Sequence, residues 1–288
     1  MISPLFVAKA TLEADELAAI QKLVQLCNEH DGIDLKVNPD MLQSRPGKHT
    51  EDFLCYQDEQ LVGFLGLYSF HGGEAEVSGM VLPDYRRAGI FRKLQEMSAE
   101  ACKLRSIPQQ LFIIQRESAS GKAFVESLGA EYSFSEYWMD LQPEKRSVPA
   151  SHAVQLRLAE KEDLDTLIWL NVHGFQMEEE QAREMTQRIE GESSSNTYLI
   201  IVHDQPIGKI STNKMGNEGF IFGFCVHPDH QGKGYGRVAL GQSIEFLLQE
   251  GMSSVSLEVA CENNGALSLY ESCGFFVKSA NDYYKLSI

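Results

Sequence analysis

The apolar and polar positions of this chain predict a mixed α/β protein. Short apolar runs bounded by polar residues indicate strands, and apolar residues spaced three to four positions apart indicate helices. In the second half, strands are expected at 154–157, 198–203, 206–212, 220–226, 254–260, 275–278 and 283–286, and helices at 162–172, 235–250 and 266–272. Gly251 directly follows the longest of these helices, where a left-handed glycine commonly ends a helix. This order predicts a mixed, twisted sheet flanked by helices.

The first half of the chain repeats this pattern, with strands expected at 53–56, 61–68, 75–81 and 111–115. Arg86 corresponds to Gln231 and Gly89 to Gly234, because 231 minus 86 and 234 minus 89 both give 145. A duplicated domain is the simplest cause of such a repeat. In a chain of 288 residues, we therefore expect two tandem α/β domains, 1–145 and 150–288, each long enough to bury a core. The boundary is expected in the polar, proline-containing stretch 142–149.

A glycine-rich loop lies between the apolar run that ends at Val226 and the helix expected from residue 235. Glycines leave backbone N–H groups exposed, and a helix N-terminus adds the positive end of its dipole, so such a junction binds phosphate. The residues expected to hold a pyrophosphate are Gln231, Gly232, Lys233, Gly234, Tyr235, Gly236 and Arg237. Lys233 and Arg237 are expected to add positive charge, although either is also typical of a solvated loop or helix.

This loop and a later segment resemble the GNAT superfamily of acyl-CoA-dependent N-acetyltransferases. Residues 231–236 match the family pattern Q/R-x-x-G-x-G/A. The family's later pattern N-x-x-A-x-x-L-Y-x-x-x-G-F is matched by Asn263, Ala266, Leu269, Tyr270, Gly274 and Phe275. The resemblance implies two tandem GNAT-like domains and acetyl-CoA as the acyl donor. It also implies that the backbone N–H of Val226 polarises the acetyl carbonyl and that Asn263 either bonds the pantetheine arm or caps the next helix.

Acetyl transfer to an amine needs a group that removes a proton, because an amine with a pKa of about 10 is protonated at neutral pH. By resemblance to the N-terminal-peptide acetyltransferases of the superfamily, Glu258 is the expected base and Tyr270 the acid that protonates the departing thiolate. A phenol with a pKa of about 10 and a thiol with a pKa of about 8.5 leave only a small mismatch. Glu218, just before the strand at 220–226, is a competing base, and a sheet-edge or capping role for Glu258 stays open.

The first domain departs from the family pattern at the positions that carry the chemistry. Phe91 stands at the position of Gly236, Ile113 at that of Glu258, Ser118 at that of Asn263 and Val125 at that of Tyr270. We therefore expect 1–145 to be a degenerate GNAT-like domain with a structural, regulatory or acceptor-binding role, and 150–288 to be catalytic. Whether the first domain binds CoA is left open.

The amino-acid composition limits the compartments and partners that are expected for this protein. Six cysteines lie scattered without a C-x-x-C motif, which predicts neither a disulfide framework nor a metal site and fits a reducing cytoplasm. The formal net charge of −16 argues against nucleic acid as a partner and is compatible with a cationic acceptor. We see neither an export signal nor an apolar run long enough to span a membrane, so no membrane partner is expected.

Two other functions fit parts of the sequence. Residues 234–239 match G-x-G-x-x-A, and Glu258 follows at the distance of a ribose-binding acid, as in NAD-type dinucleotide-binding enzymes. The repeat at 89–91 breaks that fingerprint. The other alternative is a non-catalytic acyl-CoA sensor or scaffold. The acceptor, a small-molecule or peptide amine, is left open, and the protein is expected to be a monomer with an internal pseudo-dimer, or a dimer.

Overall fold

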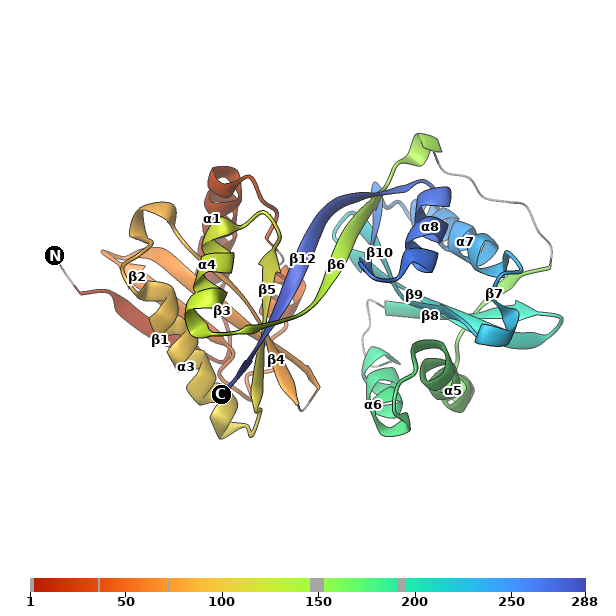
Figure 1. The fold of residues 1–288 in the computed structure, drawn as a ribbon, viewed down its shortest axis with the longest axis horizontal. Helices are drawn as coiled ribbons and strands as arrows, with labels where there is room; N and C mark the ends of the chain where they lie inside the picture. Colours follow the sequence, from red (N-terminus) through yellow and green to blue (C-terminus); the bar gives the residue numbers. More distant parts are fainter. Residues whose placement is uncertain (1–2, 36, 72, 146–152, 191–194) are drawn as a thin grey trace. The chain divides into compact units, whose positions relative to one another are not determined.

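The structure is a computed structural model that describes residues 3–35, 37–71, 73–145, 153–190 and 195–288. The chain forms two compact units (Figure 1). Unit 1 consists of Met1–Ser135 together with Ser279–Ile288, and unit 2 of Glu136–Lys278. None of the described helices is both long and apolar enough to cross a bilayer.

Unit 1 is a sheet with helices packed on it. Its elements are β1 (Leu5–Lys9), α1 (Ala14–Asp31), α2 (Pro39–Gln43), β2 (Asp52–Gln57), β3 (Gln60–His71), β4 (Glu74–Val81), η1 (Pro83–Tyr85), α3 (Ile90–Leu104), β5 (Gln109–Gln115), α4 (Ala119–Leu128) and the start of β6 (Glu131–Leu141). The strand order is β1-β2-β3-β4-β5-β12, with β12 (Phe275–Ser287) contributed by the end of the chain. Strands β4 and β5 are parallel, and the other pairs with a recorded register are antiparallel.

Unit 2 repeats this architecture. Its elements after β6 are η2 (Pro143–Lys145), β7 (Gln155–Leu158), η3 (Lys161–Asp163), α5 (Leu164–Phe175), α6 (Glu179–Glu190), β8 (Ser195–Val202), β9 (Gln205–Met215), β10 (Glu218–Val226), η4 (Pro228–His230), α7 (Tyr235–Gln249), β11 (Ser254–Ala260), α8 (Asn264–Ser272) and the start of β12. Its strand order is β6-β11-β10-β9-β8-β7, and β10 runs parallel to β11.

Most predicted elements are confirmed. Helix α7 covers the predicted range within one residue, and Gly251 behind it has the left-handed φ of 90°. The prediction of two closing strands is wrong, because 275–278 and 283–286 belong to one 13-residue strand, β12. Residues 279–282 continue it, since Ala280, Asn281 and Asp282 are buried and Asn281 pairs with Gln115 of β5.

The two units exchange their last strands. In unit 1, Gln115 of β5 pairs with Asn281 of β12, and in unit 2, Ala260 of β11 pairs with Glu136 of β6. These partners are related by the sequence repeat, because 281 minus 136 and 260 minus 115 both give 145. Each sheet therefore keeps the register that its own strand would give, while that strand comes from the other half of the chain.

This exchange moves the division between the units away from the expected boundary. A cut at 145 to 150 would assign 136–145 to the first domain and 279–288 to the second, whereas both segments belong to the opposite unit. Part of the expected boundary stretch, 146–149, lies outside the described residues. The repeat itself is preserved in three dimensions: α3 and α7 have 15 residues each, and β5 and β11 have 7.

Helices cover both faces of the unit 2 sheet. Ile210 of β9 packs with Leu240 and Ile244 of α7. On the neighbouring strand, Leu199 packs with Leu167 and Leu170 of α5. Leu199 pairs with Lys209, next to Ile210, and successive side chains of a strand point to opposite faces. One face, the α7 face, therefore carries the main core, and Lys209 belongs to the other, the α5 face.

Both sheets open between their two parallel strands. The recorded pairing of β4 with β5 ends at Val77 and Phe112, and that of β10 with β11 at Ile221 and Leu257. Directly after Ile221, β10 carries an irregularity between Phe222 and Cys225 in its pairing with β9. The matching stretch of β4 pairs with β3 in unbroken register from Glu76 to Val81. The bulge is therefore a feature of unit 2, and bulges often lie beside active sites.

Candidate active site

The glycine-rich loop joins β10 to α7 in unit 2. Gly232 and Gly234 have φ values of 72° and 81°, a left-handed conformation that favours glycine. A Cβ added at either position would meet no heavy atom within 4 Å, so space lies open beside the backbone. The N-terminus of α7 follows at Tyr235. Open backbone next to a helix N-terminus suits an anionic group such as a phosphate.

Two loop side chains are used to hold the loop itself. Gln231 Nε2 donates to the carbonyl oxygen of Val226 at 2.9 Å, and Lys233 Nζ donates to that of Asp229 at 2.8 Å. In unit 1, Arg86 makes the bond equivalent to that of Gln231, because its Nε donates to the carbonyl oxygen of Val81 at 2.9 Å. The first residue of the loop motif thus ties the loop to the end of the preceding strand in both units.

The N–H of Val226 points toward the opening between β10 and β11. The next N–H along the strand, that of His227, donates to Ile207 on the β9 side at 2.7 Å. Because successive N–H groups of an antiparallel strand point to opposite sides, the Val226 N–H faces the β11 side, beyond the last pair at Ile221 and Leu257. This direction agrees with the role predicted for Val226.

Glu258 is half-buried on β11, one residue beyond Leu257. Leu257 and Val259 pack into the core of the α7 face, so Glu258 between them points to the α5 face. It lies opposite Trp138 of β6, whose ring stacks on Phe220 at 5.4 Å. Glu258 thus stands at the opening, beside two half-exposed aromatic rings.

The competing base, Glu218, lies elsewhere. It is the first residue of β10 and pairs with Met215 and Ser254, whereas Val226 and the loop follow the other end of the strand. Nearly the full length of β10 separates Glu218 from the loop. The geometry therefore favours Glu258 over Glu218 as the carboxylate beside the opening.

Tyr270 is 7% exposed and belongs to the core of the α7 face. Its ring contacts those of Phe224 and Phe275, with centroids at 6.4 and 6.2 Å. Burial raises the pKa of Tyr270 to about 12, well above the value assumed from the sequence. Glu258 and Tyr270 therefore lie on opposite faces of the sheet. Both side chains could approach a ligand that is held between β10 and β11.

Asn263 caps α8. Its Oδ1 accepts a hydrogen bond from the backbone N–H of Ala266 at 3.0 Å. In unit 1, Ser118 caps α4 in the same way, because its Oγ accepts from the N–H of Gly121 at 3.2 Å. The structure therefore shows the capping bond of Asn263, while its bond to the pantetheine arm stays a prediction.

Lys209 was missed by sequence reasoning. It stands in the middle of β9, is 2% exposed and faces α5. Its Nζ lies 5.5 Å from the centroid of the Phe175 ring. The sequence signal for it is a lysine at the centre of the apolar run 206–212, outside the two motifs at 231–236 and 263–275.

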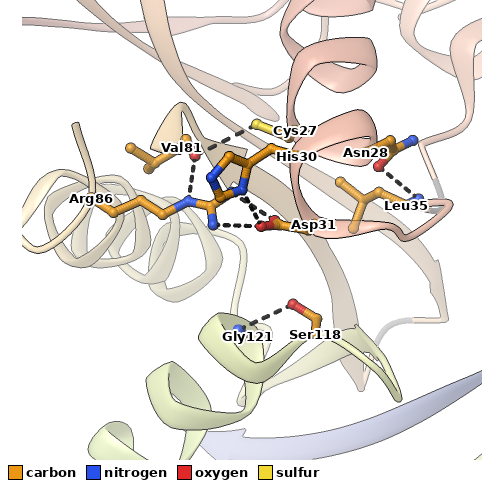
Figure 2. A network of polar contacts seen from close by, with 9 residues as sticks. All are labelled: Cys27, Asn28, His30, Asp31, Leu35, Val81, Arg86, Ser118 and Gly121. Carbon is orange, nitrogen blue, oxygen red and sulfur yellow. Dashed lines mark hydrogen bonds and ion pairs between the residues drawn. The ribbon is translucent and has the colours of Figure 1, made fainter. Parts of the chain in front are cut away.

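Unit 1 holds a cavity of about 690 Å³ at the corresponding opening. The cavity is bounded by the loop residues Arg86, Arg87 and Gly89, by both parallel strands, and by Ser118 at the start of α4. Figure 2 shows Arg86 turned toward α1, where its two terminal nitrogens donate to the Asp31 carboxylate at 2.9 and 2.7 Å. Hydrogen bonds from Arg86 hold the pKa of Asp31 below its usual value.

The catalytic positions of unit 1 are apolar and buried. Ile113 is 4% exposed and Val125 is fully buried. A ring from α3, Phe91, packs edge-on against Phe124 at 4.8 Å. These side chains offer no group that exchanges a proton.

A family model matches residues 159–275, and its description is "Acetyltransferase (GNAT) family". Residues 159–275, which lie within unit 2, form a GNAT acetyltransferase domain. Among its relatives, a mycothiol acetyltransferase of Propionibacterium freudenreichii is 25% identical over 95% of this chain and 89% of its own. A ribosomal protein bS18-alanine N-acetyltransferase of Escherichia coli is 41% identical over a shorter stretch, 20% of this chain and 40% of that protein.

Solved structures show the same fold over nearly the whole length of the chain. A GCN5-related N-acetyltransferase from Sphaerobacter thermophilus superposes with a TM-score of 0.80 at 20% identity, covering 98% of this chain and 95% of that one. A tandem GNAT protein from the clavulanic acid biosynthesis pathway gives 0.76 at 18% identity, covering 99% and 98%. The predicted tandem arrangement of two mixed α/β domains is thereby confirmed.

Proposed function

We propose that unit 2 transfers an acetyl group from acetyl-CoA to a primary amine by direct attack. The observation that carries this proposal is the opening between β10 and β11. It has the glycine loop at one end, Glu258 on one face and Tyr270 on the other. Such an arrangement can hold a thioester between two strands and reach it from both sides.

The loop and the N-terminus of α7 would bind the pyrophosphate. Backbone N–H groups around Gly232 and Gly234 supply the donors, and the helix dipole favours the negative charge. Because Gln231 bonds to the Val226 carbonyl at the end of β10 and Lys233 to the Asp229 carbonyl, their part is to hold the loop in this shape. The pantetheine arm would run along β10, where the Val226 N–H polarises the acetyl carbonyl.

Glu258 would take the proton from the acceptor amine on the α5 face. The neighbouring rings of Trp138 and Phe220 are half-exposed, and aromatic faces attract an ammonium group. A cationic amine would therefore be held beside the carboxylate that deprotonates it. The net charge of −16 favours the approach of such a cation.

Tyr270 would donate a hydrogen bond to the sulfur as the carbon–sulfur bond breaks. A phenol with a pKa of about 12 keeps its proton at neutral pH and is a weak acid toward a thiolate. Against a thiol with a pKa of about 8.5, full proton transfer is uphill by roughly 5 kcal/mol. Stabilisation of the departing thiolate by the hydrogen bond is therefore the larger part of its contribution.

A small-molecule amine is the acceptor that the relatives favour. The relative aligned over most of both chains is named a mycothiol acetyltransferase, whereas the one named for a ribosomal protein alanine covers a fifth of this chain. Unit 1 would bind an acyl-CoA without turning it over. Its cavity is bounded by the equivalent loop, but Ile113 and Val125 stand at the positions of Glu258 and Tyr270.

The test is the release of free CoA from acetyl-CoA in the presence of a panel of small amines. Tyr270→Phe and Glu258→Gln are expected to lower kcat by about 100-fold or more each, the usual size of acid–base contributions. Glu218→Gln, which changes the carboxylate at the far end of β10, is expected to leave kcat unchanged. Loss of turnover in Glu218→Gln with full activity in Glu258→Gln would contradict the assignment.

A further inference from the structure

Lys209 is a buried amine that has no ionic partner among the described residues. Its side chain is 2% exposed, and it stands opposite Cys225, itself buried. Among the residues that the structure describes, no hydrogen bond or ion pair reaches its Nζ, whose recorded contact is the Phe175 ring. Buried charges in proteins are normally paired, so an unpaired lysine in this place calls for an explanation.

The surroundings favour the uncharged form of this amine. Burial lowers the pKa of Lys209, because the ammonium form loses its hydration and gains no carboxylate in return. Cys225 does not change this balance, since burial raises the pKa of its thiol and keeps it protonated. A neutral primary amine is a nucleophile, whereas the ammonium of a surface lysine is not.

The backbone of β10 makes room for Nζ. At Gly223, in the bulge, a Cβ would lie 3.2 Å from Lys209 Nζ and 3.5 Å from Ser211 Oγ. The φ of 54° at Gly223 is also one that favours glycine. The lysine side chain therefore leans from β9 across β10 at the bulge, over a position that has no side chain of its own.

This places the amine at the narrow end of the opening. The ladder between β10 and β11 ends at Ile221 and Leu257, and Gly223 follows two residues later. A ligand that enters at the glycine loop and extends along β10 has its far end here. In acetyl-CoA bound in this way, the far end is the thioester.

Unit 1 has none of these features at the matching positions. Phe64 stands in place of Lys209 and Met80 in place of Cys225, and both are buried in an apolar core. Ser78 replaces Gly223 in the stretch of β4 from Glu76 to Val81, where the register with β3 is unbroken. The lysine, the glycine and the bulge thus occur together in the unit that keeps Glu258 and Tyr270.

We infer that Lys209 is itself an acetyl acceptor, so that unit 2 acetylates its own buried lysine. The inference rests on the proposed function, because the acetyl group comes from acetyl-CoA bound in the opening of unit 2. The neutral amine attacks the thioester carbon; a nitrogen–carbon bond forms, the carbon–sulfur bond breaks, and the proton lost by nitrogen goes to the departing thiolate. The products are Nε-acetyl-Lys209 and free CoA.

The experiment uses the full chain and acetyl-CoA labelled with ¹³C in the acetyl group. The protein is incubated at neutral pH without any added amine, digested, and mapped by mass spectrometry. The expected result is one label on the peptide that contains Lys209, formed at least about ten times faster than the label at Lys214. Lys214 is an exposed lysine of the same strand and reports unassisted acetylation.

Four variants make the result specific. Lys209→Met is expected to lose the label, and Lys209→Arg serves if the Met variant fails to fold. Gly234→Glu, which blocks the loop, is expected to lower labelling of Lys209 to the rate of Lys214. Lys214→Arg is expected to leave labelling of Lys209 unchanged. A label that hydroxylamine removes would lie on Cys225 as a thioester and would overturn the assignment to Lys209.

Failure of this inference can be told from failure of the proposed function. If acetyl-CoA binds and unit 2 acetylates an added amine while Lys209 stays unlabelled, self-acetylation is wrong and the transferase function stands. If no acetyl-CoA binds to unit 2, both are overturned together. Equal labelling of Lys209 in the parent protein and in Gly234→Glu would also overturn the inference, because the acetyl group would then not come from the opening.

Discussion

The two units share a loop and differ in what lies beside it. In unit 2, a ring from the strand, Phe224, packs near Gly236 of the helix, where a Cβ would lie 3.4 Å from it. In unit 1, the ring comes from the helix, Phe91, and packs near Gly79 of the strand, where a Cβ would lie 2.9 Å from it. In each unit, one large and one small residue therefore fill the contact between strand and helix, but the two residues have exchanged places. Loop geometry was therefore retained while the catalytic side chains diverged.

A second difference concerns buried charge. On unit 1, Asp52 is fully buried and receives two hydrogen bonds from Arg45, at 3.0 and 2.8 Å. Arg45 also lies over the ring of Tyr68 at 4.9 Å and bonds to Glu51. On unit 2, Lys209 has no such partner in the described part of the chain. Removal of one partner from the Arg45–Asp52 pair would leave a buried charge uncompensated, whereas Lys209 already bears the cost of burial without a carboxylate and is compatible with a chemical role.

The strongest test of the comparison between the two loops is to make the same substitution at the left-handed glycine of each, Gly234 in unit 2 and Gly89 in unit 1. Gly234→Glu is expected to weaken acetyl-CoA binding to unit 2 by about 100-fold or more, roughly 2.7 kcal/mol. The φ of 81° strains a non-glycine residue, and the new carboxylate repels the pyrophosphate. Gly89→Glu, at a φ of 79°, is expected to remove only binding to unit 1. Calorimetric titration of each variant with acetyl-CoA gives the number of sites lost.

The outcome of that titration also decides whether unit 1 binds at all. Two sites in the parent protein, each lost in one variant, would support binding in both units. A single site that survives Gly234→Glu and disappears in Gly89→Glu would reverse the roles proposed for the two units.

The buried charges predict opposite changes in stability. Asp52→Ala leaves the Arg45 guanidinium buried without its bidentate partner and is expected to lower the free energy of unfolding by about 3 kcal/mol. Lys209→Met replaces an unpaired amine by an apolar side chain of similar length and is expected to raise the free energy of unfolding by about 1 kcal/mol. Urea denaturation of both variants measures the two values. A destabilised Lys209→Met would mean that Nζ has a partner in the folded protein.

The smallest expected effect is on the free energy of unfolding, when Arg86 is replaced by glutamine, the residue that unit 2 has at this position as Gln231. Arg86→Gln keeps a donor for the Val81 carbonyl, as Gln231 has for Val226, and removes only the ion pair with Asp31. Because the pKa of Asp31 is lowered in the folded state, the ion pair stabilises unit 1 above the unfolded pKa of about 3.9 and loses this effect as pH falls through the folded value. We expect a difference of about 1 kcal/mol between the parent protein and the variant at pH 7.

This difference should shrink in urea titrations as the pH falls below the unfolded pKa of about 3.9 and through the lowered folded pKa of Asp31. A difference that stays constant from pH 7 to pH 3 would assign the effect of Arg86 to packing and to the Val81 carbonyl instead.

Much of the fold could be predicted from local patterns in the sequence. The strand at 254–260 and the helix from 235 follow from their apolar pattern, and the loop between β10 and α7 follows from its glycines. Two roles were predicted for Asn263; the structure shows the capping bond, and the bond to the pantetheine arm stays a prediction. The pKa of Tyr270 was not predictable, because it depends on packing by Phe224 and Phe275.

By itself, the sequence determined the repeat of 145 residues, the order of strands and helices, and the pattern of the loop, because these depend on neighbours within a few positions. The tertiary structure alone decided the exchange of β6 and β12, since both candidate strands offer the same register and no local signal distinguishes them. It also decided that Glu258 and Tyr270 lie on opposite faces and that Lys209 lies over Gly223. These relations join residues far apart in the chain, and they arise only when the sheet is assembled.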